Sequence, residues 1–155
     1  PFSTCGFLKE LGRMKGMPKM MVGLTSSSSA EVMKGCPKQA EGMIIPTSFA
    51  PITPAAKEVA ALAEANGGSA DLHSAASWEN VMIIKDVIEA VGITGDPSKV
   101  KEERAKIRDG LEALKTTEGL IGTVTRVQDE GEALKPFVFV HAKNGNWEVL
   151  HDPRN

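Results

Sequence analysis

Several signatures are missing from this chain, and each absence argues against a class of protein. The 155 residues contain no apolar run that approaches the roughly 20 residues needed by a membrane-spanning helix. The net charge of −2 and the scattered lysines and glutamates leave no basic stripe for nucleic acid and no polybasic anchor for a membrane surface. Binding of nucleic acid or of a membrane surface is therefore not expected.

Cysteine is scarce, which bears on metal and redox chemistry. Cys5 and Cys36 are the only two, and without a C-x-x-C spacing they indicate neither a zinc site nor a dithiol redox motif. We expect no metal and no cofactor. The two residues could pair in an oxidising compartment, or could remain two small, partly buried thiols, because one pair does not make the framework of a small secreted fold.

Catalytic motifs are missing as well. The segment 23–27 lacks the G-x-S-x-G spacing of a serine hydrolase, and the candidate bases His73, His141 and His151 have no evident orienting partner. No G-x-G-x-x-G follows a strand, and no P-loop is present. Asp71 and His73 diverge on a helix and cannot share a metal as an i, i+4 pair would. We expect no enzyme, and keep a small α/β serine hydrolase only as an unfavoured alternative.

What is present is the composition of an ordinary globular protein. The sequence is 41% hydrophobic and 25% charged, and its length is typical of about one domain. It begins at Pro1, with neither a methionine nor a charged and then apolar leader. We therefore expect a start that was processed, cloned or cut.

The first third of the chain alternates helix and strand patterns. Apolar spacing predicts a helix over residues 7–15. Continuously apolar runs at 20–24 and 42–46 predict two strands covered on both faces, as in a parallel sheet. Between them, the serines at 26–29 can cap a helix that begins near Ala30. This β-loop-α-β order is the unit from which open α/β sheets are built.

The middle of the chain reads as a stiff crossover followed by helices. The segment from Pro46 to Pro54 contains three prolines, at positions 46, 51 and 54. Because proline restricts the backbone, this segment is expected to be extended and stiff, which favours a crossover between two packing units. Thr53 is expected to cap a helix that has Pro54 at its first position. Apolar residues recur three and four apart over 78–91, which predicts a helix that is mostly core.

A further capped helix is expected from Asp96 onward. Its pattern points Val100 inward and places Glu103 on a solvated face.

The last third reads as β structure. The runs 119–125, 135–140 and 147–150 predict short strands, separated by turn signals at 129–131 and 144–145. Asp, Asn and Gly suit such turns because they tolerate the positive φ of a tight reversal. The pattern supplies no nucleophile beside a base and no metal-ligand cluster, so it indicates a structural closure.

The order and spacing of these segments resemble a known family. The segments that carry the resemblance are Ala40-Glu41-Gly42, Phe49-Ala50-Pro51, Trp78 with Ala90-Val91-Gly92, residues 118–124 and residues 135–138. Together they resemble the C-terminal part of the branched-chain amino acid binding family of ABC transporters, which has the type I periplasmic-binding fold. The resemblance extends from about Leu8 to Leu150.

The resemblance implies an α/β fold made of parts of two three-layer α/β/α lobes joined by hinge crossovers. Residues 1–48 would end the C-terminal lobe, residues 49–136 would form part of the N-terminal lobe, and residues 137–155 would supply a hinge strand and return to the C-terminal lobe. Full members of the family are longer, so the resemblance also implies that most of the first lobe is missing.

The function that the resemblance implies is capture of a ligand without bond breaking. The chain would be a fragment of the extracytoplasmic solute-binding component of an ABC importer. It would capture a small amino acid or small carboxylate, aromatic ones included, by lobe closure and deliver it to a membrane permease. The implied location is the periplasm, after removal of a signal peptide, or the cell exterior through a lipid anchor. The same lobes could instead form the ligand-sensing domain of a regulator or receptor.

The resemblance also implies that the sheets of both lobes are short of strands. An isolated fragment is then expected to associate with itself or to exchange segments with another copy through the open sheet edges.

The first candidate ligand-binding residues are hydroxyl groups. Thr25, Ser26 and Ser27 follow a strand and precede a helix, which is where open α/β sheets place ligands. The alternative is that they only cap that helix. Ser48 and Phe49 leave the second strand at the crossover and could line the cleft, although Phe49 could instead pack beneath the hinge.

The remaining candidate, Trp78, opens a helix and could close over a ligand from the other lobe, because its ring is amphipathic. It could equally belong to the core, since it is in register with Val81 and Ile84. The neighbouring Glu79 could meet an ammonium group, but is better explained as an exposed first-turn carboxylate favoured by the helix dipole.

Overall fold

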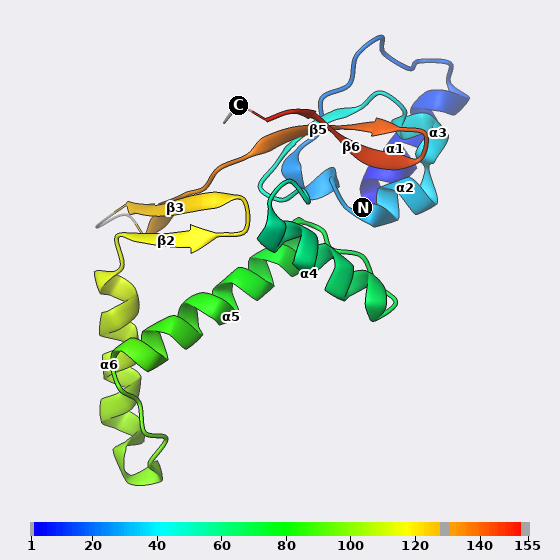
Figure 1. The fold of residues 1–155 in the computed structure, drawn as a ribbon. Coiled ribbons are helices and arrows are strands. Elements are labelled where there is room, and N and C mark those ends of the chain that lie inside the picture. The colour runs from blue at the N-terminus through cyan, green and yellow to red at the C-terminus, as the bar shows by residue number, and fades with distance from the viewer. Residues whose placement is uncertain (1, 128–130, 153–155) are drawn as a thin grey trace.

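The computed structural model describes residues 2–127 and 131–152 (Figure 1). Its helices are α1 (Phe2–Arg13), η1 (Thr25–Ser27), α2 (Ala30–Gly35), α3 (Pro37–Ala40), α4 (Pro54–Ala65), α5 (Leu72–Ala90), η2 (Pro97–Lys99) and α6 (Val100–Ala113). Its strands are β1 (Ile44–Thr47), β2 (Thr116–Gly119), β3 (Gly122–Val127), β4 (Glu132–Leu134), β5 (Val138–Lys143) and β6 (Asn146–His151).

The strands form two separate sheets of three strands each. One has the order β1-β5-β6 and the other β2-β3-β4. Figure 1 shows the first sheet beside α1, α2 and α3, and the second beside the long helices α5 and α6. The expected α/β class is confirmed.

The expected parallel sheet is wrong, because every pairing between the named strands is antiparallel. The predicted strand at 20–24 is reduced to one isolated parallel bridge, Val22 with Ile44. Gly23 N donates to Ile44 O at 2.8 Å, and Ile44 N donates to Met21 O at 2.9 Å. The side chains of Met20, Val22 and Leu24 are 71%, 70% and 78% exposed. A continuous apolar run predicts a covered strand only where other elements pack on both of its faces.

The closing β region has two more strands than the three runs predicted, because β4 was not predicted and one predicted strand is divided. The run predicted as a single strand at 119–125 is instead the β2–β3 hairpin, with Leu120 and Ile121 buried at its tip. The turn predicted at Asn144 and Gly145 is confirmed, with φ of 52° and 75°. Of the other predicted turn, Asp129 and Glu130 lie outside the described residues.

Most of the buried apolar residues form two clusters. We name the first the sheet cluster; it comprises Cys5, Leu8, Val32, Met33, Cys36, Ala40, Met43, Ile45, Ala50, Val138, Val140 and Ala142. We name the second the helix cluster; it comprises Phe49, Ala56, Val59, Ala75, Leu120 and Ile121. Ile52, in the proline-rich crossover, packs against both clusters.

The crossover ends in a helix start that its sequence predicts correctly. The side chain of Thr53 accepts a hydrogen bond from Ala56 N, and Pro54 occupies the first turn of α4. The first helix, in contrast, begins at Phe2 and not at Phe7.

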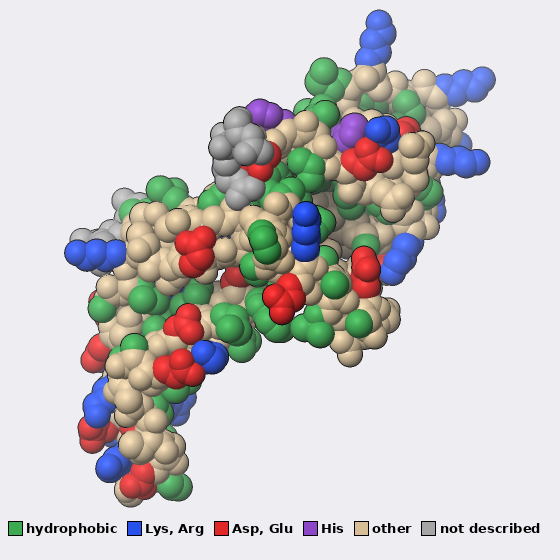
Figure 2. All heavy atoms as spheres, viewed as in Figure 1, with side chains coloured by type: hydrophobic (Ala, Val, Ile, Leu, Met, Phe, Trp, Pro, Cys, Tyr) green, Lys and Arg blue, Asp and Glu red, His purple; other side chains and the backbone are tan. Residues whose placement is uncertain are grey.

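The prediction that the Trp78 helix is mostly core is wrong. Within α5 the buried residues are Ala75, Glu79 and Val87, whereas Val81 is 65% exposed and Trp78 is 41% exposed. Figure 2 shows hydrophobic side chains gathered on the surface over α4 and α5. The cause is one-sided packing: α6 approaches α5 closely at Gly110, where a Cβ atom would lie 2.7 Å from Val87 Cγ1. The apolar pattern of α5 extends beyond the face covered there.

The Asp96 helix start is confirmed, but two side chains are placed differently from the prediction. Asp96 accepts a hydrogen bond from Ser98 N at 2.8 Å, while Val100 is exposed and Glu103 is buried. Glu103 accepts hydrogen bonds from Thr94 N at 2.8 Å, from the Thr94 hydroxyl at 2.6 Å and from Gly95 N at 3.1 Å. It therefore fixes the loop between α5 and η2 and does not face solvent.

These hydrogen bonds generate a pH-dependent prediction. The Thr94 hydroxyl, with Thr94 N and Gly95 N, lowers the pKa of Glu103. A lowered pKa in the folded state contributes stability above the unfolded-state value, and this contribution is lost as the pH falls through the folded-state pKa. We expect Glu103→Gln to lower the free energy of unfolding at pH 7, and the difference from the parent chain to shrink under acidic conditions. Urea unfolding of both chains at pH 7 and at acidic pH measures this difference in the free energy of unfolding. Glu112→Gln, an exposed position on α6, is the control.

A disulfide bond joins Cys5 on α1 to Cys36, which ends α2. The alternative of two separate thiols is therefore wrong. Both residues are buried in the sheet cluster, and the bond closes a loop of sequence separation 31. It ties together helices that lie on one face of the first sheet.

Reduction of this bond should destabilise the chain. Because a cross-link restricts the unfolded chain, a loop of this size contributes about 3 to 4 kcal/mol. We expect a reductant to lower the melting temperature of the parent chain and to leave that of the Cys5→Ser/Cys36→Ser double variant unchanged. Equal melting temperatures of the parent chain with and without reductant would contradict this prediction.

Candidate functional site

A cavity of about 560 Å³ and another of about 470 Å³ are present among the described residues. The larger lies within one half of the molecule, between α5, α6 and β2. The smaller is lined by residues of α2, β1, β5 and β6 on one side and of α4 and the start of α5 on the other, with the crossover at 49–51 between them. We take the smaller cavity as the candidate site because it brings together both buried clusters, and we name it the cleft.

Hydroxyl groups and the crossover form one end of the cleft. Thr47, the last residue of β1, is buried, and its hydroxyl oxygen lies 3.4 Å from Ser28 Oγ. The same hydroxyl oxygen accepts a hydrogen bond from Phe49 N at 3.4 Å. Ser28 Oγ donates to Thr25 O at 2.8 Å. These bonds fix the point where the chain leaves the first sheet.

An aromatic side chain forms part of the wall on the sheet side. Trp147, on β6, donates from Nε1 to Ser29 O at 3.1 Å. Ser29 in turn caps α2 through a hydrogen bond that its side chain accepts from Glu31 N at 3.2 Å. The indole ring is therefore held against the N-terminal end of α2 while it lines the cleft.

A capped helix start forms the opposite wall. Asp71 accepts hydrogen bonds from His73 N and Ser74 N, both at 3.0 Å, and its own N–H donates to Ser74 Oγ at 2.8 Å. This reciprocal arrangement is a capping box, and it fixes the N-terminus of α5 at the edge of the cleft.

The predicted site residues are distributed around the cleft and beyond it. Phe49 lines the cleft and is also buried in the helix cluster. Thr25, Ser26 and Ser27 form η1, directly before the cleft residue Ser28. They do not provide the side-chain cap of α2, which comes from Ser29. Two further predicted residues remain. Ser48 lies between the cleft residues Thr47 and Phe49, and Trp78 lines the larger cavity.

Most of the cleft lining was not predicted from the sequence, including the polar and aromatic residues Glu64, Asp71, Trp147 and Glu148. The start of a helix at Asp71 was detectable, because aspartate is a preferred N-cap residue. Trp147 reads only as part of a strand. No local signal places these residues together, because the tertiary fold brings them from distant positions.

Glu79 has a structural role that differs from the expected exposed carboxylate. It is buried on α5, and its Oε1 accepts a hydrogen bond from Leu120 N at 2.7 Å. Its Oε2 pairs with Lys135 Nζ. Leu120 O accepts a hydrogen bond from the Thr53 hydroxyl at 2.5 Å. The β2–β3 tip is thus held between α4 and α5, beside the larger cavity.

Removal of the Glu79 carboxylate should be costly. Glu79→Ala leaves the partly buried Lys135 without its partner, and breaking a buried pair in this way costs about 3 to 5 kcal/mol. We expect a large loss in the free energy of unfolding, measured by urea denaturation, and a smaller loss for the double variant Glu79→Ala/Lys135→Met, which removes both charges. The exposed variant Glu89→Ala, on the same helix, is the control. A Glu79→Ala variant as stable as the parent chain would contradict this role.

The described residues provide neither a cluster of His, Cys, Asp or Glu side chains for a metal ion nor a membrane-spanning helix. No group of three or more His, Cys, Asp or Glu side chains there could hold a metal ion. Within the same part of the chain, no helix combines the length and apolar character that crossing a membrane requires.

A cavity between two buried clusters, with walls of aromatic and hydroxyl side chains, is the arrangement of a ligand-binding protein. The profile of the periplasmic binding protein family matches residues 3–146. The chain therefore belongs to the periplasmic binding protein family, whose members bind substrates and are not enzymes. No match to the chain was found among curated proteins.

Solved structures share the fold of this chain. A leucine-binding protein from Thermotoga maritima is 21% identical with a TM-score of 0.74, and the match covers 99% of this chain and 43% of that protein. An ABC transporter substrate-binding protein from Desulfitobacterium hafniense in complex with Leu is 21% identical with a TM-score of 0.68, covering 94% and 39%. An extracellular ligand-binding receptor from Rhodopseudomonas palustris is 18% identical with a TM-score of 0.79, covering 96% and 45%.

These likenesses confirm the type I periplasmic-binding fold that the sequence resemblance implies. The chain spans about two fifths of the length of the solved structures it matches.

Proposed function

We propose that this chain is part of the extracytoplasmic solute-binding component of an ABC importer. In this function a small amino acid or small carboxylate, aromatic ones included, is captured between two lobes and delivered to a membrane permease. The observation that carries the proposal is the cleft of about 470 Å³ between the sheet cluster and the helix cluster, in a chain that belongs to the periplasmic binding protein family.

The proposed lobes follow the two buried clusters. Residues 1–48 and 137–155 belong to one lobe and its return strands, and residues 49–136 to the other. Support comes from the path of the chain, which leaves β1 at Thr47 and returns to β5 at Val138. Motion of the lobes would then be concentrated in the two connections beside these residues, as in other closures about a hinge.

The proposed contacts combine hydroxyl groups with aromatic walls. Thr25, Ser26, Ser27 and Ser48 would offer hydroxyl groups near the cleft, and Phe49 an apolar wall. Phe49 is supported by its position in the cleft lining. Trp78 lines the other cavity, so its contact with a ligand requires that the two regions come together when the lobes close.

The ligand class is supported by the relatives. One solved structure with this fold is described as a leucine-binding protein and another as a complex with Leu. Neutral amino acids are accordingly the first ligands to test. The proposal of a permease as partner is supported by the same relatives, one of which is described as an ABC transporter substrate-binding protein.

The proposed location is extracytoplasmic, in the periplasm or anchored by lipid at the cell exterior. The family name supports a periplasmic location, and the Cys5–Cys36 disulfide supports an oxidising compartment. Self-association of the isolated chain is also proposed, because β6 in the first sheet and β2 and β4 in the second are outer strands with one side unpaired to another strand among the described residues.

A thermal-shift panel of neutral amino acids tests the proposed function. A ligand that binds only the folded state raises stability by about 2.7 kcal/mol at 100 times its Kd, so at least one of leucine, isoleucine, valine and phenylalanine should raise the melting temperature. Thr47→Val should weaken this response, because it removes the hydroxyl at the cleft while keeping the side-chain shape.

The matched control is Thr123→Val, which replaces an exposed threonine on β3. It should respond to ligand as the parent chain does. A full panel of amino acids and small carboxylates without any shift would count against the proposed function.

A further inference from the structure

Methionine is concentrated in one short segment of the chain. Met14, Met17, Met20 and Met21 are four of its seven methionines, and the first three are spaced three residues apart. They lie in residues 14–21, which follow α1 and which we name the methionine loop. No described residue of this loop lines the cleft, so the clustering is not explained by the candidate site.

Core packing does not explain the first three methionines of the loop. Met14, Met17 and Met20 are 67%, 37% and 71% exposed, whereas Met21 is partly buried and packs against the sheet cluster. An apolar side chain stabilises the fold by being removed from water, and these three remain in contact with it. Their thioether sulfur atoms are therefore accessible to a ligand from solvent.

The backbone of the methionine loop is held at its two ends. Gly16 N donates a hydrogen bond to Leu11 O at 2.9 Å, and Met21 O accepts one from Ile44 N at 2.9 Å. Between these points, residues 17–20 form no backbone hydrogen bond within the described part of the chain. The middle of the loop can therefore adjust around a ligand without breaking secondary structure.

The spacing of the exposed methionines brings their sulfur atoms within reach of one another. Residues three apart have Cα atoms separated by at most about 11 Å, even in a fully extended chain. Methionine adds an unbranched side chain with three rotatable bonds, which adapts readily to its surroundings. Three thioethers can therefore converge on one small ion.

The ligand atoms of this loop are soft. Thioether sulfur is a soft ligand, of the kind that selects Cu(I), whereas carboxylate and carbonyl oxygen suit Mg²⁺ and Ca²⁺. Residues 14–21 contain no carboxylate, imidazole or thiol side chain, so the usual ligands of Zn²⁺ are missing there. The loop is therefore suited to a soft metal ion and poorly suited to a hard one.

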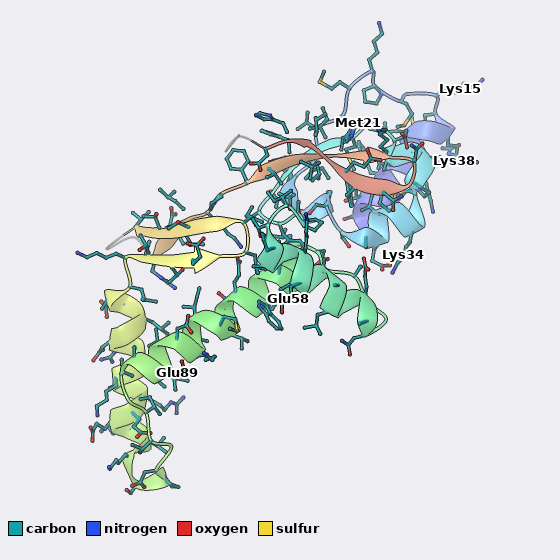
Figure 3. The ribbon with its side chains drawn as sticks, in the orientation of Figure 1. Lys15, Met21, Lys34, Lys38, Glu58 and Glu89 are labelled. Atoms are coloured by element: carbon teal, nitrogen blue, oxygen red, sulfur yellow. A yellow bond between two sulfur atoms is a disulfide. The ribbon has the colours of Figure 1, made fainter. Side chains whose placement is uncertain are left out.

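The charges of the loop favour an ion of low charge. Lys15 and Lys19 lie between the methionines, and their ammonium groups repel any cation. The repulsion is weaker for a monovalent ion than for a divalent one. Both lysines are exposed, so water and salt screen them, and Figure 3 shows Lys15 directed away from the body of the molecule.

We propose that the methionine loop binds one soft monovalent metal ion, Cu(I), through the sulfur atoms of Met14, Met17 and Met20. The expectation that the chain binds no metal considered cysteine, histidine and carboxylate ligands, and did not consider thioethers. The loop is separate from the cleft, so this proposal stands or falls independently of the proposed function.

Silver tests the proposal on the full chain. Ag(I) has the same charge as Cu(I) and is similarly soft, and it requires no reductant, so the Cys5–Cys36 disulfide stays intact. Isothermal titration calorimetry with silver nitrate in chloride-free buffer should show binding, and failure of the parent chain to bind Ag(I) would overturn the proposal.

NMR spectra of the methionine methyl groups locate the bound ion. Ag(I) should shift the signals of the three exposed loop methionines, and an excess of Zn²⁺ should leave them in place. Shifts confined to the methionines outside the loop would overturn the proposal. Those methionines are Met33, Met43 and Met82.

Leucine variants test whether sulfur is required. Met17→Leu/Met20→Leu keeps two exposed apolar side chains of similar size but removes two ligands, so it should bind Ag(I) roughly tenfold or more weakly. The matched control is Met82→Leu on α5, where the side chain is 38% exposed, and it should bind as the parent chain does. Equal affinity of the double variant and the parent chain would contradict the proposal.

Discussion

The antiparallel pairing of β1 with β5 is the constraint on which the remaining structure depends. It places Ile45 opposite Val140 and Thr47 opposite Val138, and all four side chains are buried. The segment between Thr47 and Val138 leaves β1 and returns to its neighbour β5 at the same end of the two paired strands. The helix cluster, the contacts of Glu79 with Leu120 and Lys135, and one wall of the cleft all lie within this segment. Their position relative to the first sheet is therefore set by the two connections that follow Thr47 and precede Val138.

Local chemistry was predictable from the sequence, and packing was less so. Thr53 followed by Pro54, Asp96 followed by Ser98, and Asn144 followed by Gly145 specify helix starts and a turn through bonds within a few residues, and all three occur as predicted. The predictions about burial depended on neighbours that the local pattern does not contain. The exposed run 20–24 and the exposed face of α5 are the result.

The candidate site was predictable to a similar extent. The crossover could be anticipated because its prolines restrict the backbone. Phe49 lies in the cleft lining, and its contact with a ligand stays a prediction. The acidic residues of the cleft lining could not be identified from the sequence, because Glu64, Asp71 and Glu148 are far apart in it and each resembles an ordinary surface or capping residue. Glu79 and Glu103 show the same difficulty. Their buried carboxylates accept hydrogen bonds from backbone N–H groups, and apolar periodicity in the sequence does not reveal these partners.

The disulfide has a consequence for the order in which the molecule acquires its final rigidity. Its Cys36 end adjoins α2, which contributes Ala30 and Met33 to the cleft wall. A chain made in reducing surroundings would reach this wall with its helices held by packing alone. With the proposed extracytoplasmic location, the disulfide would form only after export. The cleft wall formed by α2 would therefore be less rigid before export than after it.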